Sequence, residues 1–288
     1  MTNHNNQPLL PSPHVIRDAV RMALEEDLGY GDLTTEATVP AGVEVEGVII
    51  ARAHGVVAGL PVAREVFAEL DSGMTFDQAV PDGASVEPGD VLVEIFGSAR
   101  AILSGERVAL NFLQQLSGVA TATRRIVEQL EGTNTVLLDT RKTVAGLRAL
   151  QRYAVRVGGG SNHRFNLFDG VLIKENHILA AGGIAAALDR ARAAVGPFTP
   201  VEIEIERLDQ LDEAIRHGAD MILLDNMTVE EMIEAVAIAS GRVKLEASGD
   251  ITAKRARAIA ETGVDYLSSG ALTHSAPALN LSLRLDSG

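Results

Sequence analysis

The chain has 288 residues, and its 25 lysine and arginine side chains face 39 acidic ones, a formal net charge of −14. Hydrophobic residues make up 46% of it, which is typical of a globular protein with a buried core. The acidity argues against broad nucleic-acid binding and against an anionic membrane surface, since both select basic proteins. Cysteine is absent, which excludes disulfides, thiolate catalysis and cysteine-ligated metals.

The start of the chain, MTNHNNQPLLPSPH, lacks the basic and apolar segments of a secretory signal. No apolar run approaches the ~20 residues of a membrane span. We therefore expect a cytoplasmic protein with neither membrane nor nucleic acid as a partner. Residues 1–12 are expected to form a flexible tail.

Residues 13 to about 103 are predicted to form a small unit of helices and short strands. The stretch SPHVIRDAVRMALEEDLG predicts a helix that is capped by Ser12, has Pro13 in its first turn and ends at Gly29. VEVEGVIIARA predicts a strand, GLPVAREVFAEL a helix, and PDGASVEPGDVLVEIFG short strands between turns. Residues 104–131 keep helical periodicity, so one long helix or two successive helices lead into the second half.

Six short apolar runs in the second half each end in polar or charged residues. Helical patterns separate them, and one helix starts with a capping box of Thr228 and Glu231. This alternation predicts parallel strands with crossover helices. We favour a (β/α) barrel over a doubly wound sheet, because barrel active sites lie at the carboxyl ends of the strands, where these polar groups stand. Since there are six runs rather than eight, the barrel is expected to be incomplete. The runs are VLLDTRK (136–142), VLIKENH (171–177), VEIEIE (201–206), MILLDN (221–226), KLEASG (244–249) and YLSSGA (266–271).

The ending ALNLSLRLD alternates leucine with polar residues and predicts a half-buried strand that returns to the first unit. We therefore divide the chain into an N-terminal domain over residues 13–115, joined by the strand at 276–288, and a barrel catalytic domain over residues 116–275.

Positive charge gathers at the predicted strand ends. From Asp139 to His177 the acidic chain has seven lysine or arginine side chains and three acids. Small residues with accessible amides end the last two strands, where barrels commonly bind phosphate. The pattern predicts a polyanionic substrate, with a phosphate at the late strands and Mg²⁺ near the carboxylates. The cations are Arg141, Lys142, His163, Arg164 and Lys174, the carboxylates Glu204 and Asp225, and the small residues Ser248, Gly249, Ser269, Gly270 and Ala271.

Some of these features have structural alternatives. Arg148, Arg152 and Arg156 recur every four residues, which is typical of a solvated or interface face of a helix. The glycine run 158–160 indicates a helix stop rather than a phosphate cradle.

Two features favour a functional role over a structural one. Glu202, Glu204 and Glu206 share one strand face, which is unusual for a packed core, so at least one is expected to function. Lys174 ends an apolar strand, and buried lysine is rare without a partner.

Several motifs, in order along the chain, resemble one known family. The stretches EEDLGYGDLTT, ERVALNFLQQLSGVAT, DTRKT, YAVRVGGGSNHR, LIKENH, ILLDNM and ETGVDYLSSGALTHS are similar to those of quinolinate phosphoribosyltransferases. The resemblance implies an N-terminal α/β sandwich followed by an incomplete α/β barrel of the type II phosphoribosyltransferase kind. It also implies transfer of phosphoribosyl from phosphoribosyl pyrophosphate (PRPP) to quinolinate with decarboxylation. The products would be nicotinate mononucleotide, pyrophosphate and CO₂, in de novo NAD biosynthesis with Mg²⁺ as cofactor.

The resemblance assigns roles to individual residues. It implies that Arg141, His163, Arg164 and Lys174 meet the quinolinate carboxylates, with Thr140 assisting. It places Lys142 on PRPP, and Glu204 and Asp225 on ribose hydroxyls and on the metal, directly or through water. The implied catalytic residues are Lys142, Lys174, Glu204 and Asp225. Those implied around the 5-phosphate are Ser248, Gly249, Asp250, Ser269, Gly270 and Ala271, with His274 nearby.

The resemblance further implies a homodimer in which Arg107 reaches into the partner's site, and it leaves a hexamer open. Four residues depart from the usual family pattern: Ala145 replaces a proline, Asn166 a glycine, Asp250 a glycine or asparagine, and Glu175, a mild change, an aspartate.

Three alternative functions were weighed. A paralogue with another acceptor would alter the dicarboxylate clamp, which is intact here. A Schiff-base aldolase would use Lys174 and would be trapped by borohydride. A biotinyl or lipoyl carrier needs a lysine on an N-terminal hairpin, and residues 1–141 have none.

Overall fold

The computed structural model of the chain describes residues 8–285, which divide into two compact units. The first contains the described residues up to Arg124, the segment Thr143–Gly159, and the chain from Thr273 onward. The second contains Arg125–Lys142 and Gly160–Leu272. Residues 1–7 of the expected tail and residues 286–288 of the expected C-terminal strand lie outside the described residues. The domain boundary between residues 115 and 116 stays a prediction.

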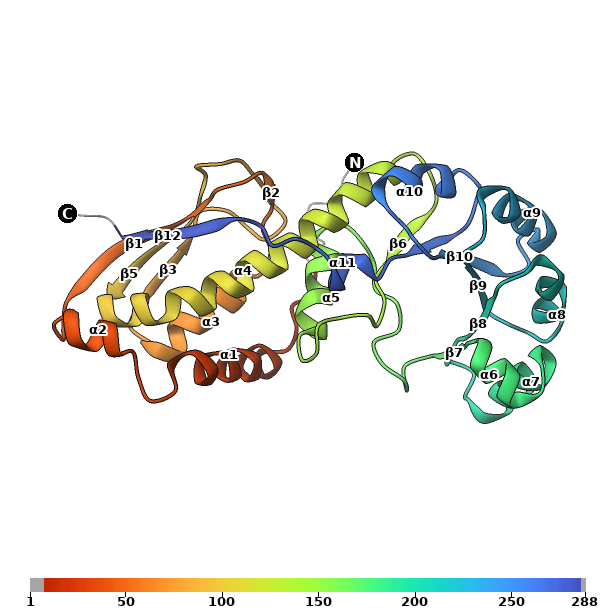
Figure 1. Ribbon diagram of the computed structural model, residues 1–288, viewed down its shortest axis with the longest axis horizontal. Helices are drawn as coiled ribbons and strands as arrows, with labels where there is room; N and C mark the ends of the chain where they lie inside the picture. The colour runs from red at the N-terminus through yellow and green to blue at the C-terminus, as the bar shows by residue number, and fades with distance from the viewer. Residues whose placement is uncertain (1–7, 286–288) are drawn as a thin grey trace. The chain divides into compact units, whose positions relative to one another are not determined.

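The first unit has a four-stranded antiparallel sheet in the order β12-β1-β5-β3, with helices α1, α3 and α4 along one face (Figure 1). The last strand, β12, pairs with β1, so the alternating leucines at the end of the chain close one edge of this sheet. A separate two-stranded ladder joins β2 and β4. The strands are β1 (Glu44–Ala51), β2 (Gly55–Val56), β3 (Thr75–Gln78), β4 (Ser85–Val86), β5 (Val91–Ser98) and β12 (Leu281–Leu285).

The helices of the first unit follow their apolar spacing. In α1 the residues Ile16, Val20 and Leu24 recur every four positions and are buried, as expected for one helix face. The periodic stretch at 104–131 forms one long helix, α4, which begins at Ala99. These helices are α1 (Pro13–Leu28), α2 (Leu33–Thr38), α3 (Leu60–Leu70), α4 (Ala99–Val127, which continues into the second unit) and α5 (Arg148–Val157).

Helix α5 bears on two predictions. Arg152 is only 8% exposed, which rules out the solvated alternative at that position, and the interface alternative stays a prediction. The helix ends at Gly158, as the glycine run predicts. A Cβ on Gly158 would lie 2.5 Å from the carbonyl oxygen of Ala120, so close packing against α4 also requires glycine here.

The second unit has six parallel strands in the order β6-β11-β10-β9-β8-β7. Helices α7 to α10 line the outside of the curved sheet (Figure 1). Its end strands β6 and β7 do not pair, and part of the chain that connects them belongs to the first unit, so the barrel is incomplete as expected. The strands are β6 (Val136–Leu138), β7 (Val171–Ile173), β8 (Val201–Ile205), β9 (Met221–Asp225), β10 (Lys244–Ser248) and β11 (Tyr266–Ser268).

One crossover helix, α9, begins where the sequence indicates. In α9 the hydroxyl of Thr228 accepts from the amide of Glu231, and the Glu231 carboxylate accepts from the amide of Thr228, which confirms the capping box. Within residues 8–285, no helix combines the length and the apolarity that crossing a bilayer requires. The helices are η1 (Glu128–Leu130), α6 (Glu175–Ala181), α7 (Ile184–Ala194), η2 (Leu208–Gln210), α8 (Leu211–Arg216), α9 (Val229–Ala239), α10 (Ala253–Ala260) and α11 (Ala271–His274, which continues into the first unit).

Candidate active site

A cavity of about 600 Å³ lies at the carboxyl ends of the second unit's strands. Parallel strands bring these ends to one rim, so residues far apart in the sequence meet there. Most of the predicted site residues line this cavity. The lining residues are Thr140, Arg141, Lys142, His163, Arg164, Leu172, Lys174, Glu204, Leu223, Asp225, Asn226, Glu246, Ser248, Gly249, Asp250 and Ser268.

Two arginines give one part of the cavity a concentrated positive charge. Arg164 is partly buried, and its Nη1 donates to the carbonyl of Gly170 at 2.8 Å. Burial and the nearby charge of Arg141 lower the pKa of Arg164. Two guanidinium groups that repel each other in a cavity are suited to an anionic ligand, which would relieve the repulsion.

Lys174 stands beside carboxylates from two neighbouring strands. Its Nζ forms an ion pair with Glu204, whose side chain is 12% exposed. Burial and the charge of Glu204 raise the pKa of Asp225, while Lys174 and Lys142 oppose that change. Lys174 is therefore not the buried lysine that its place after an apolar strand suggests, because its side chain is 49% exposed, but it does have an acidic partner in Glu204.

The loops after β9 and β10 pack closely at the rim. Asn226 has φ 56, its amide donates to the carbonyl of Ser248 at 3.0 Å, and its side chain donates to Asp225 at 2.8 Å. Gly249 has φ +99, and a Cβ there would lie 2.1 Å from Oδ1 of Asn226. Glycine is therefore required at this point of the late-strand loop.

A buried acidic cluster lies next to the cavity. Nε2 of His163 is 3.0 Å from Oε2 of Glu202 and 3.4 Å from Oε2 of Glu246. Burial lowers the pKa of His163, but its contacts with the two carboxylates outweigh burial and raise the pKa above its ordinary value. Burial raises the pKa of Glu202, which the hydrogen bond from His163 opposes.

Several predicted residues fall outside the cavity lining. Ser269 is buried just after β11, where its amide donates to the carbonyl of Leu138 and its hydroxyl to that of Ile251. Gly270 and Ala271 follow it. Arg107 and His274 belong to the first unit, and Arg107 is exposed on α4, beside a pocket that Asp32 also lines.

Two of the departures from the family pattern, Asn166 and Asp250, have local explanations, and nothing in the structure explains Ala145. Ala145 is exposed in the loop before α5. Asn166 accepts the amide of Phe168 on its side chain at 3.0 Å, which stabilises a tight turn. Asp250 has φ 48, which glycine or asparagine adopts at lower cost, and its carboxylate pairs with Arg255 at 3.3 Å, within its own loop and helix.

Sequence reasoning missed Glu246 and Asn226. Glu246 lies in the apolar run before Ser248, and the two share a strand face because they are two residues apart. This spacing is the pattern in the sequence from which the position of Glu246 at the site could have been predicted. Nothing in the sequence marks Asn226 apart from its place after Asp225.

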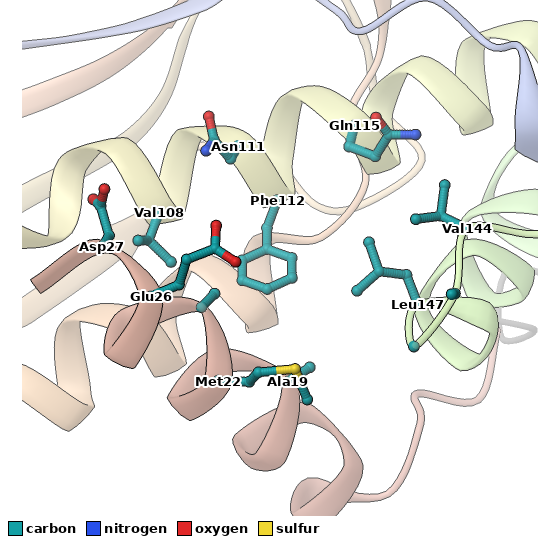
Figure 2. Close-up of a pocket in the computed structure, with 13 residues that line it drawn as sticks. Ala19, Met22, Glu26, Asp27, Val108, Asn111, Phe112, Gln115, Val144 and Leu147 are labelled. Carbon is teal, nitrogen blue, oxygen red and sulfur yellow. The ribbon is translucent and has the colours of Figure 1, made fainter. Parts of the chain in front are cut away.

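The first unit has its own apolar cavity of about 360 Å³. In Figure 2 the side chains of Met22 on α1, Phe112 on α4, and Leu147 in the loop before α5 point into it. Glu26 and Asp27 are its acidic members, and among residues 8–285 no basic side chain lines it. It therefore lacks the charge of an anion site.

Comparisons with known proteins agree with the geometry. The family models for the quinolinate phosphoribosyl transferase N-terminal and C-terminal domains match residues 32–117 and 119–284.

Similar curated proteins align with most of this chain and most of their own length. The chain is 46% identical to a nicotinate-nucleotide pyrophosphorylase (carboxylating) of Mycobacterium leprae over 93% of this chain and 96% of that one. It is 44% identical to a probable enzyme of that name from Bacillus subtilis, over 90% and 89% of the two chains.

A solved structure extends this similarity to three dimensions. The nicotinate-nucleotide pyrophosphorylase of Francisella tularensis superposes with a TM-score of 0.92 at 41% identity and covers 99% of this chain and 100% of that chain. The chain therefore belongs to the quinolinate phosphoribosyl transferase family.

Proposed function

We propose that this protein transfers the phosphoribosyl group of PRPP to quinolinate and releases CO₂, which yields nicotinate mononucleotide and pyrophosphate for NAD biosynthesis. The observation that carries the proposal is the set of charges in one cavity, which brings Arg141 and Arg164 together with the Lys174–Glu204 pair and Asp225. A dicarboxylate needs such cations, and the carboxylates suit a ribose and a metal ion.

Quinolinate would occupy the cationic part of the cavity. Its carboxylates suit the guanidinium forks of Arg141 and Arg164 and the point charge of Lys174, and Thr140 and His163 stand beside them. The repulsion that lowers the pKa of Arg164 supports this assignment, because a bound carboxylate would remove it.

PRPP would lie toward the late strands. Lys142 would contact its pyrophosphate, and the loops after β10 and β11 would frame the 5-phosphate with backbone amides. This assignment uses Ser248, Gly249, Asp250, Ser269, Gly270 and Ala271.

Glu204 and Asp225 fit Mg²⁺, which prefers carboxylate oxygens and keeps several waters. Burial and, after it, the charge of Glu204 raise the pKa of Asp225, so the two carboxylates repel each other, and a divalent cation would relieve this repulsion. The ion would neutralise charge on the leaving pyrophosphate. Since Lys174 also engages Glu204, binding through water is compatible with this arrangement.

The chemistry needs no protein nucleophile. The anomeric C–O bond to pyrophosphate breaks as the pyridine nitrogen forms the new C–N bond, and the positive charge on the ribose is stabilised by the carboxylates of Glu204 and Asp225. The ring then carries a positive nitrogen, which absorbs the electron pair left when CO₂ departs, and a proton replaces CO₂ on the ring carbon.

We also propose a cytoplasmic homodimer in which Arg107 completes the partner's site. Its support is apolar exposure in each unit: Tyr30 and Leu33 in the first and Leu167 and Phe168 in the second are large and solvent-exposed. Exposed apolar groups of this kind mark interfaces between chains.

The first test is release of CO₂ from carboxyl-labelled quinolinate by the purified protein. We expect release only when PRPP and Mg²⁺ are both present, and nicotinate should not replace quinolinate. No release in the complete mixture would overturn the proposal.

A further inference from the structure

Three buried carboxylates surround the loop that presents Arg164. Asp139, Glu202 and Glu246 follow or belong to different strands, β6, β8 and β10, and are 0%, 4% and 0% exposed. Burying a carboxylate costs free energy unless its oxygens accept hydrogen bonds or lie near a positive charge. Each of these three acids is therefore expected to have a structural or functional role.

Asp139 fixes the start of this loop. Its carboxylate accepts from the side chain of Asn162 at 2.6 Å and from the amide of His163 at 2.9 Å. The amide of Ser161 donates to the carbonyl of Leu137 at 2.8 Å, so the loop is tied to β6. One acid thus holds the main chain up to residue 163.

The other two acids meet at the ring of His163. Nε2 lies 3.0 Å from Glu202 and 3.4 Å from Glu246, and the opposite ring nitrogen, Nδ1, accepts the amide of Arg164 at 2.7 Å. The ring therefore links Glu202, by a hydrogen bond, to the main chain of the next residue. Glu246 acts on the ring by charge, because neither of its buried oxygens accepts a hydrogen bond among the described residues. The Arg164 guanidinium is fixed in turn by its bond to the carbonyl of Gly170.

The two sides of the ring favour different protonation. The two carboxylates raise the pKa of His163 to about 10, which favours a hydrogen on both nitrogens at neutral pH. The Arg164 amide, whose hydrogen points at Nδ1, instead requires that nitrogen without one. The peptide plane fixes the amide hydrogen. The contact to Arg164 therefore selects the tautomer with its hydrogen on Nε2, which donates to Glu202.

We propose that Glu202 and Glu246 are positioning residues that act through the imidazole of His163 to hold Arg164 in the quinolinate clamp. This inference rests on the proposed function and gives His163 the role of a link rather than a direct ligand. The three groups could also be donors to a metal ion. However, a direct contact of 3.0 Å between Nε2 and Oε2 is that of a hydrogen bond, and we favour the link.

Kinetics of three variants test the link. Glu202→Met and Glu246→Met remove the carboxylates at similar size, and Glu202→Gln keeps an acceptor for Nε2–H. We expect KM for quinolinate to rise about tenfold in each methionine variant and only a fewfold in Glu202→Gln, with KM for PRPP unchanged. Glu206→Met, at an exposed position just beyond the end of β8, is the control and should match the parent protein.

A merely structural role gives a different result. Misfolding lowers kcat with the fraction of active protein and leaves both KM values unchanged, and this result would overturn the link. A double-mutant cycle sharpens the distinction: adding Glu202→Met to His163→Asn should change KM for quinolinate by less than about twofold, because the link is already broken. Fully additive losses would contradict it.

Nuclear magnetic resonance of ¹⁵N-histidine protein tests the geometry without any activity, so it remains decisive if the proposed reaction is wrong. Among the seven histidines, the signal missing from His163→Asn identifies the ring. At neutral pH we expect a hydrogen on Nε2 alone. A doubly protonated ring would overturn the link, as would one equivalent of tightly bound transition metal that Glu246→Met loses.

Discussion

At the scale of the residue, Gly249 is the position where the smallest change should have a large effect. Its φ of +99 and the closeness of Asn226 leave no room for a Cβ. In Gly249→Ala the displaced Asn226 would disturb its hydrogen bond to Asp225. We expect KM for PRPP to rise about tenfold or more, since a charge-assisted contact near the ribose is lost.

Gly132→Ala is the matched control for this substitution. Gly132 also has a positive φ, +79, but an added Cβ would meet nothing within 4 Å. Both variants carry about 1–2 kcal/mol of backbone strain, so both should melt somewhat earlier. Only Gly249→Ala should lose affinity for PRPP, and equal KM values in the two variants would mean that the late-strand loop does not hold the substrate.

Individual site residues could be predicted from the sequence where a charged residue stands at the end of an otherwise apolar run. Lys174 ends an apolar strand, and this anomaly correctly placed it in the cavity. Glu246 escaped notice because one acid in an apolar run resembles an ordinary half-buried strand. The role of Glu246 depends on its contact with His163, which lies 83 positions earlier in the chain. No local pattern in the sequence predicts this contact.

At the scale of the element, the periodicity of apolar residues predicted the strands and the long helices. It did not predict which strands pair with each other. The apolar runs predicted all six barrel strands, since each run ends in polar residues at the rim. The pairing of β6 with β11 depends on how the sheet curves, which local sequence does not encode. The short elements α2 and β3 were missed, because elements of six and four residues depend on tertiary contacts more than on pattern.

Helix α4 allows a comparison of two glycines in one element. A Cβ on Gly118 would lie 2.2 Å from the carbonyl oxygen of Pro277, which is backbone, in the segment that leads to β12. A Cβ on Gly105 would meet side chains instead, Leu70 at 2.9 Å and Phe67 at 3.1 Å. In both, alanine gains about 1 kcal/mol of helix propensity.

Gly118→Ala should therefore be the more destabilising of the two substitutions. The carbonyl cannot move without shifting the return of the chain to β1, whereas the side chains near Gly105 can change rotamer. We expect a loss of about 2 kcal/mol or more for Gly118→Ala and a smaller one for Gly105→Ala, measured by urea unfolding. Equal midpoints for the two variants would show that the return segment is not tightly packed on α4.

At the scale of the whole molecule, the proposed dimer makes a site from two chains. Arg107 is on α4 of the first unit, while the cavity belongs to the second. If Arg107 acts on the partner, Arg107→Ala damages the neighbour's site, whereas Lys174→Ala damages the chain's own. Each variant alone should be nearly inactive toward quinolinate, because each loses a charge-assisted contact of about 1.5–3 kcal/mol.

Mixing the two inactive variants then separates action across the dimer from action within the chain. Refolding an equal mixture of Arg107→Ala and Lys174→Ala produces mixed dimers in which one of the two sites has every residue intact, so about a quarter of the parent CO₂ release should return. A mixture of Lys174→Ala with Arg141→Ala should stay inactive, because these residues line the same chain's cavity and every site keeps one defect. Light scattering verifies that both mixtures are dimeric. If the first mixture recovers no more than the second, Arg107 does not act across the dimer.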